Sequence, residues 1–122
     1  MADHAQERGF KVRGQLWGEE NVQKTWDYFK KFDEGFARLV NDQCFGEIWS
    51  RPGLPRETRS MITLALIVAL NRGEEFRMHV RAALSNGVTR EEIKEVLLQC
   101  AIYCGVPAAN SAFHAADEML GK

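Results

Sequence analysis

The sequence predicts an all-α fold. Apolar residues recur at three- and four-residue steps along most of the chain, and no stretch shows sustained period-two alternation. Hydrophobic residues make up 45% of the 122 residues, which is enough for the core of one domain. We therefore expect a single domain over residues 1–122, built as a helical bundle of five or six helices.

The first half of the chain predicts two long helices. Residues 1–20 are the least regular part, with three glycines, so we expect an irregular arm with one short helix there. The apolar stripe from Val22 to Val40 predicts a helix over residues 21–41. Turn residues dominate positions 45–54, which predicts a break. Pro55 then suits the start of a helix over residues 55–72.

The second half predicts three more helices, over residues 74–85, 89–103 and 107–120. Thr89 and Glu92 have the spacing of a capping box. The segment Met61–Leu70 is apolar on nearly every side, which predicts a buried central helix. A chain this small cannot easily cover such a helix alone, so the pattern favours a homo-oligomer, with a compact monomeric bundle as the alternative.

Charge and cysteine content narrow the class of protein. The formal net charge of −1 gives no electrostatic reason to expect nucleic acid or an anionic membrane as a partner. The first residues lack the apolar core of a secretion signal, and the longest apolar run, Leu64–Leu70, is too short to span a bilayer. Three cysteines without a disulfide-framework spacing indicate reduced thiols and a cytoplasmic location.

Glu75 and His79 are the first candidates for chemistry. They lie four residues apart on a predicted helix, so their side chains share one face. A carboxylate beside an imidazole raises the imidazole pKa, which provides a proton donor near neutral pH. The alternative is a solvated surface pair without a catalytic role.

The segment before the central helix is the second candidate. Glu47, Trp49 and Arg51 combine an acid, an aromatic ring and a cation in a loop, where ligand contacts are common. The alternative is a connector in which Trp49 packs on the core. Further cations that could hold an anion are Arg8, Arg13, Arg56 and Arg59.

A metal site is not expected. Cys100 and Cys104 lie on one helix face, but no third or fourth ligand has suitable spacing. We interpret them as packing residues.

Several segments resemble the carboxymuconolactone decarboxylase family, within the AhpD-like superfamily. The narrow signatures are Trp49–Leu54 (WSRPGL) and Gly105–Asn110 (GVPAAN), and further similarity lies in Thr58–Ala65 and Glu75–Leu84. The segment Gly87–Ile93 is shared across the superfamily and indicates the fold alone. Peroxidase-type relatives carry C-x-x-C shortly before the helix histidine. Positions 71–78 contain no cysteine here, which argues against thiol-based peroxide reduction.

The resemblance implies a cofactor-independent decarboxylase that converts 4-carboxymuconolactone, a lactone dicarboxylate, to 3-oxoadipate enol-lactone and CO2 in protocatechuate catabolism. It also implies a homo-oligomer, commonly a hexamer. The substrate carries its own electron sink, so the protein must bind carboxylates, stabilise a dienolate oxygen and deliver a proton.

The residue types match these tasks. The catalytic candidates are His79, Glu47 and Glu75. The substrate-binding candidates are Arg51, Trp49, Arg13, Arg59 and Tyr103. The alternatives are a paralogue acting on another unsaturated lactone or β-keto acid, and a non-catalytic assembly protein of the same fold.

Overall fold

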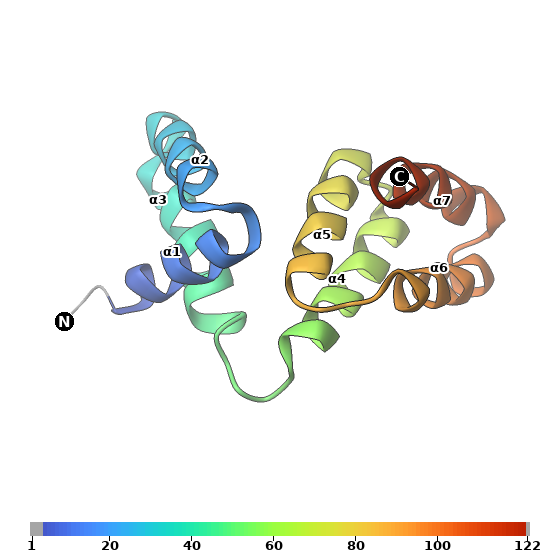
Figure 1. Cartoon of the computed structure of the whole chain (residues 1–122). Helices are drawn as coiled ribbons and strands as arrows, with labels where there is room; N and C mark the ends of the chain where they lie inside the picture. The colour runs from blue at the N-terminus through green and yellow to red at the C-terminus, as the bar shows by residue number, and fades with distance from the viewer. Residues whose placement is uncertain (1–3, 122) are drawn as a thin grey trace. The chain divides into compact units, whose positions relative to one another are not determined.

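The computed structural model describes residues 4–121, and all regular secondary structure in this range is helical, which confirms the predicted fold class. Seven α-helices and one π-helix occupy the described range, rather than the five or six helices predicted. The helices divide between two compact units, which we describe separately (Figure 1). Unit 1 ends at Leu54 and unit 2 begins at Pro55.

Unit 1 contains α1 (His4–Trp17), α2 (Glu19–Phe32), α3 (Glu34–Arg38) and the π-helix η1 (Leu39–Ile48). The prediction of an irregular arm is wrong, because α1 is a regular helix of 14 residues. Gly9 serves close packing instead. A Cβ at Gly9 would overlap the backbone carbonyl of Asn41, so glycine here lets α1 lie directly against η1.

The prediction of a single helix over residues 21–41 is also wrong. It is interrupted at Asp33, whose backbone is extended and whose carboxylate accepts a hydrogen bond of 2.9 Å from the backbone N–H of Phe36. This bond caps α3 and lets the chain change direction. The chain then stays helical through Ile48 as η1, so the predicted break over residues 45–54 begins only after Ile48. Inserted π-helical turns are frequent at functional sites.

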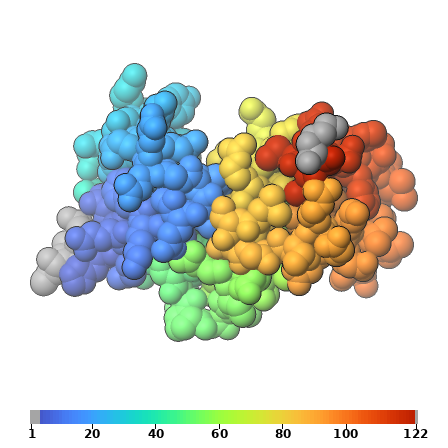
Figure 2. All heavy atoms as spheres, in the orientation of Figure 1, coloured from blue at the N-terminus to red at the C-terminus, as the bar shows by residue number. Residues whose placement is uncertain are grey.

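Unit 2 contains α4 (Arg56–Leu70), α5 (Gly73–Ser85), α6 (Arg90–Tyr103) and α7 (Val106–Leu120), close to the predicted bounds. The capping box is confirmed, because Thr89 and Glu92 exchange two bonds of 2.9 and 3.0 Å. The helix α7 packs against both α5 and α6, and Figure 2 shows the surface that these helices form in yellow, orange and red. Throughout residues 4–121, every helix is too short or too polar to cross a lipid bilayer.

The central helix α4 is buried on one side rather than all round. Leu64 and Val68 lie in the core of unit 2, at 0% and 4% exposure. Ile62, Leu66 and Leu70 are 45%, 59% and 66% exposed. These three residues follow one another at four-residue steps, so they form a single apolar stripe along α4. The predicted burial of the central helix is therefore confirmed for one face of α4, and burial of the opposite stripe in an assembly stays a prediction.

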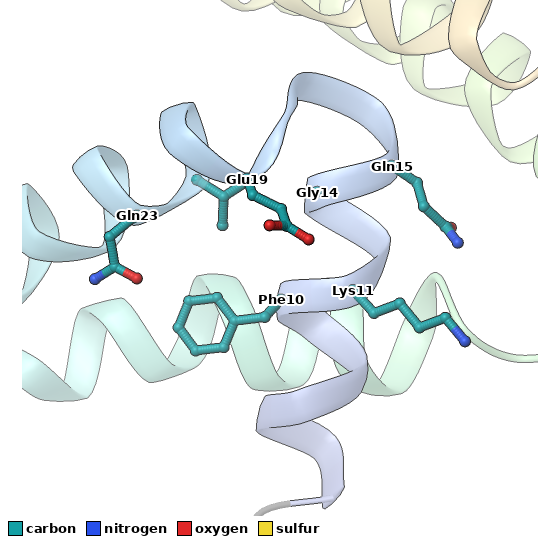
Figure 3. Close-up of a pocket in the computed structure, with 7 residues that line it drawn as sticks. Phe10, Lys11, Gly14, Gln15, Glu19 and Gln23 are labelled. Atoms are coloured by element: carbon teal, nitrogen blue, oxygen red, sulfur yellow. The ribbon is translucent and has the colours of Figure 1, made fainter.

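Two glycines on α1 allow a matched test of the contact between α1 and η1. Gly14 lies beside a hollow of about 520 Å³ between α1 and α2 (Figure 3), and a Cβ there would meet Glu19 at an ordinary 3.5 Å. Gly14→Ala should raise the free energy of unfolding by about 0.5–1 kcal/mol, because alanine favours the helix. Gly9→Ala should lower it by about 1–3 kcal/mol, because the new methyl group overlaps Asn41.

Urea unfolding at neutral pH measures both changes. A Gly9→Ala variant as stable as Gly14→Ala would show that α1 does not lie against η1 as described.

Candidate active site

The end of η1 and the turn after it carry three of the predicted site residues. Trp49 is 7% exposed and its ring stacks on that of Phe45, with 5.6 Å between centroids and 26° between planes. This packing is the alternative that the sequence left open for Trp49. The Ser50 hydroxyl donates a 2.9 Å bond to the Phe45 carbonyl, which ties the turn to the helix. Arg51 follows on the exposed side of the turn.

Glu47 lies on the exposed surface of η1 and contacts Arg8 from α1. Arg8 Nη2 is 3.1 Å from Glu47 Oε1, and Arg8 Nε donates a 2.9 Å bond to the Gly46 carbonyl. The sequence indicated Arg8 as one of several cations. Arg8 lies 38 and 39 positions before Gly46 and Glu47 in the sequence, and no local pattern predicts a contact over such a separation.

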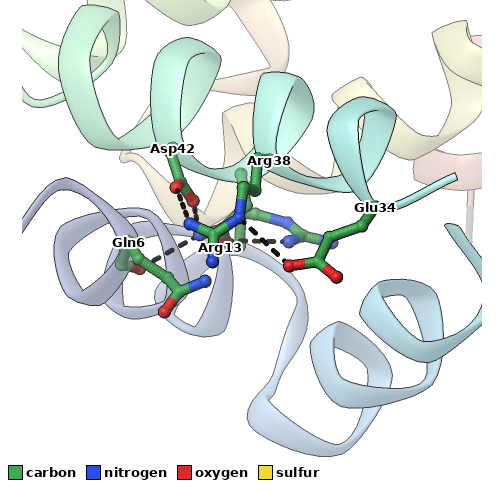
Figure 4. Close-up of polar contacts among 6 residues, drawn as sticks. Gln6, Arg13, Glu34, Arg38 and Asp42 are labelled. Carbon is green, nitrogen blue, oxygen red and sulfur yellow. Dashed lines mark hydrogen bonds and ion pairs between the residues drawn. The ribbon is translucent and has the colours of Figure 1, made fainter. Parts of the chain in front are cut away.

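Arg13 is buried, at 3% exposure, between α1 and η1. Its Nη1 donates a 2.9 Å bond to Asn41 Oδ1, and Asn41 Nδ2 donates in turn to the Gln6 carbonyl and to Asp42 (Figure 4). Burial lowers the pKa of Arg13, although an arginine stays protonated at physiological pH. The bond to Asn41 holds α1 against η1, and a contact of Arg13 with substrate stays a prediction.

In unit 2, Glu75 and His79 lie on α5 beside its buried face. Phe76, Val80 and Ala83 point into the core, whereas Glu75 is exposed and His79 is partly buried. The Nδ1 atom of His79 is out of contact with solvent.

The electrostatics of His79 differ from the sequence prediction. Burial lowers the pKa of His79 from 6.5 to about 4, and the nearby Glu75 carboxylate raises it by less. The prediction of an imidazole with a raised pKa is therefore wrong for the protein without substrate. In the free protein at pH 7 the His79 side chain is neutral.

The remaining predicted binding residues in unit 2 lie on α4 and α6. Arg59 is partly buried in the first turn of α4, and its carbonyl accepts a 2.8 Å bond from the Thr63 hydroxyl. Tyr103 is 83% exposed at the end of α6. It lines a mainly apolar cavity of about 340 Å³ between α4 and α6, together with Ile62 and Cys100.

The cysteines of unit 2 face this cavity or the core. Cys100 is 4% exposed, and both burial and the neighbouring Cys104 raise the pKa of its thiol, which makes it less nucleophilic. Across residues 4–121, no group of three or more His, Cys, Asp or Glu side chains is placed to hold a metal ion.

Glu47, Trp49 and Arg51 thus lie within one short stretch of unit 1, with Trp49 buried and the two charged residues exposed, and Glu75 lies near His79 in unit 2. That these two groups meet in one pocket stays a prediction.

Comparison with known proteins shows the family of the chain. The family model described as "Carboxymuconolactone decarboxylase family" matches residues 34–118, which is well over half of the chain. The chain belongs to this family. The resemblance predicted from the two signature segments is therefore confirmed.

Two relatives of the chain are named as decarboxylases. The chain is 45% identical over 112 residues to 4-carboxymuconolactone decarboxylase of Acinetobacter baylyi, which covers 92% of this chain and 84% of that one. It is 38% identical over 106 residues to nitrosuccinic acid decarboxylase of Metarhizium robertsii, which covers 87% and 74%. An uncharacterized 15.0 kDa protein of Paracoccus denitrificans is 35% identical over 83 residues, covering 66% and 62%.

Proposed function

We propose that this protein is a carboxy-lyase that converts 4-carboxymuconolactone to 3-oxoadipate enol-lactone and CO2 without a cofactor, as a step of protocatechuate catabolism in the cytoplasm. The observation that carries the proposal is the 45% identity, over 92% of the chain, to the enzyme of that name from Acinetobacter baylyi. Membership of the carboxymuconolactone decarboxylase family supports it.

The chemistry needs few protein groups. The bond between the ring carbon and its carboxylate breaks, and its electron pair delocalises through the ring C=C onto the lactone carbonyl oxygen. Hydrogen-bond donors near that oxygen stabilise the resulting dienolate. A general acid then delivers a proton to the carbon next to the lactone carbonyl, and solvent restores the proton on the acid.

We assign the proton delivery to His79, with Glu75 or Glu47 as the carboxylate that tunes it. His79 is neutral in the free protein, so the donor form must arise when substrate binds. The two negative charges of the substrate favour the imidazolium, since an opposite charge within about 4–6 Å raises the pKa of a histidine. Glu75, one turn away on α5, acts in the same direction.

Arg51 is the proposed clamp for the side-chain carboxylate of the substrate, because the planar guanidinium matches a carboxylate in two contacts. An arginine bound tightly to the departing carboxylate would oppose its loss, so Arg51 and Arg13 are assigned to the other carboxylate. Arg59, Trp49 and Tyr103 remain proposed substrate contacts. An Arg51→Ala variant with an unchanged KM would exclude this clamp role.

The direct test is a spectrophotometric assay with freshly generated 4-carboxymuconolactone, run in parallel with nitrosuccinic acid. Nitrosuccinate is a fitting comparison because loss of the carboxylate beside its nitro group leaves charge delocalised on the nitro oxygens, without a cofactor. We expect the lactone to be turned over at the higher kcat/KM. Turnover of nitrosuccinate alone would reassign the protein to the chemistry of its Metarhizium relative.

We further propose that copies of the chain assemble through an apolar surface of unit 2. This surface consists of the α4 stripe Ile62, Leu66 and Leu70 and the adjoining α6 residues Ile102 and Tyr103, which are 80% and 83% exposed. Ile62 and Tyr103 line the same cavity, so α4 and α6 both contribute apolar side chains to the surface at that point. Such patches mark protein interfaces. A hexamer is the number that the family resemblance implies.

Ile102→Glu should dissociate the assembly, because it places a charge within the proposed apolar contact. Phe32→Glu in unit 1 is the matched control, since Phe32 is also exposed, at 82%. Light scattering after size-exclusion chromatography gives the mass of each variant. Dissociation by Phe32→Glu and not by Ile102→Glu would place the interface on unit 1 instead.

A further inference from the structure

The guanidinium of Arg8 is fixed at two points in unit 1. Its Nε donates a 2.9 Å bond to the Gly46 carbonyl, and its Nη2 lies 3.1 Å from Glu47 Oε1. Because the guanidinium is planar, the bond at Nε sets the plane and direction of the whole group. The Nη2 atom is therefore presented to the Glu47 carboxylate from one direction.

Close backbone contact brings Arg8 to this position. A Cβ at Gly46 would overlap the backbone carbonyl of Ala5, and a Cβ at Gly9 would overlap that of Asn41. Glycine at both positions lets α1 and η1 meet backbone to backbone. Arg8 lies one residue from Gly9 and three from Ala5, so its side chain starts within reach of Gly46. The buried bond between Arg13 and Asn41 fixes the same two helices further along.

We propose that Arg8 is a positioning residue for decarboxylation, which acts by holding the Glu47 carboxylate in one orientation. The inference rests on the proposed function and on the assignment of Glu47 to its site. An unheld glutamate samples several rotamers, and ordering it when substrate binds costs free energy. Arg8 also offsets the negative charge of Glu47, which would otherwise repel a substrate that carries two carboxylates.

The chain offers a closely matched control in Arg38. The side chains of Arg8 and Arg38 are both 45% exposed, and each forms ion pairs within unit 1. Arg38 pairs with Glu34 and Asp42, at 3.3 Å each. Arg8→Gln and Arg38→Gln therefore remove the same charge from similar surroundings, and only the first removes the contact with Glu47.

The experiment measures kcat and KM for Arg8→Gln, Arg8→Lys, Arg38→Gln and Glu47→Gln, and for the Arg8→Gln/Glu47→Gln double variant. We expect Arg8→Gln to lower kcat about tenfold, the scale of one charge-assisted hydrogen bond. Arg8→Lys should recover part of the loss, because it keeps the charge without the fork. Arg38→Gln should match wild type, and Arg8→Gln should have no further effect once Glu47 is replaced.

The outcomes separate the inference from the function on which it rests. Wild-type protein without activity on the lactone would overturn the proposed function. An active wild type would overturn the inference alone if Arg8→Gln kept its kcat, or if Arg8→Gln lowered kcat equally in the Glu47→Gln background, as a structural defect would. Circular dichroism checks the fold of each variant. The ¹³C signal of the Glu47 carboxyl should move in Arg8→Gln and stay in place in Arg38→Gln, independently of turnover.

Discussion

His79→Ala should lower kcat for decarboxylation by at least about a hundredfold, which is the lower end of what a lost general acid costs. The imidazole is the group on α5 that we assign to deliver the proton to carbon, and alanine leaves no donor in its place. The fold should survive, because His79 lies beside the buried stripe of α5 rather than within it. Steady-state kinetics with the lactone gives kcat and KM separately.

His114→Ala is the control, since His114 is an exposed histidine on α7 and should keep wild-type turnover. Near wild-type turnover of His79→Ala would refute the assignment. The donor would then be Glu47, and Glu47→Gln should abolish turnover instead.

The pH dependence distinguishes a histidine acid created by substrate binding from one already present in the free protein. The pH profile of kcat/KM reports the free protein, in which the pKa of His79 is about 4, so this ratio should fall as pH rises above that value. The profile of kcat reports the complex, in which the charges of the substrate favour the imidazolium. Its fall should therefore come at a higher pH.

The sequence predicted the fold of unit 2 more closely than that of unit 1, for a physical reason. In unit 2, local signals mark the ends of helices, such as the capping box at Thr89 and the Gly105 before α7. In unit 1, Gly9 and Gly46 are explained by a contact between helices far apart in the chain. A glycine that allows close packing and one that breaks a helix look the same in a sequence, so the glycines of residues 1–20 predict an irregular arm where the structure has α1.

At Asp33 the sequence leads to the opposite error, because it predicts a continuous helix where the structure has a break. The apolar stripe runs on through residues 21–41, which predicts one helix. Instead, the carboxylate of Asp33 accepts a hydrogen bond from the backbone N–H of Phe36 and so caps the new helix α3. Aspartate is a good N-cap but also occurs within helices, so periodicity alone could not decide between the two.

The candidate site was predictable in its residue types and in the local pair of Glu75 and His79. Spacing along a helix determines which side chains share a face. It does not determine how deeply a side chain is buried, and for His79 the cost of desolvation exceeds the attraction of Glu75. The contact of Arg8 with Glu47 joins two helices and likewise leaves no local pattern.

The lowered pKa of His79 also predicts that the protein loses stability in mild acid. The pKa is about 4 in the folded state and 6.5 ordinarily, so between these values the unfolded chain binds more protons at this position. The contribution to stability is complete above about pH 6.5 and is lost as the pH falls toward 4. For a shift of this size the loss is at most about 3 kcal/mol, and partial exposure of the ring reduces it.

His79→Gln tests this linkage, because glutamine is polar and does not titrate in this range. Urea unfolding at pH 7 and pH 4.5 gives the free energy of unfolding for both proteins. Between pH 7 and pH 4.5 the free energy of unfolding should fall further for the wild type than for His79→Gln. The His114→Gln variant should behave as the wild type does. Equal losses in the wild type and His79→Gln would show that protonation of His79 is not linked to folding. The His79 imidazole would then not be desolvated and neutral in the free protein. In that case kcat/KM should begin to fall at a higher pH.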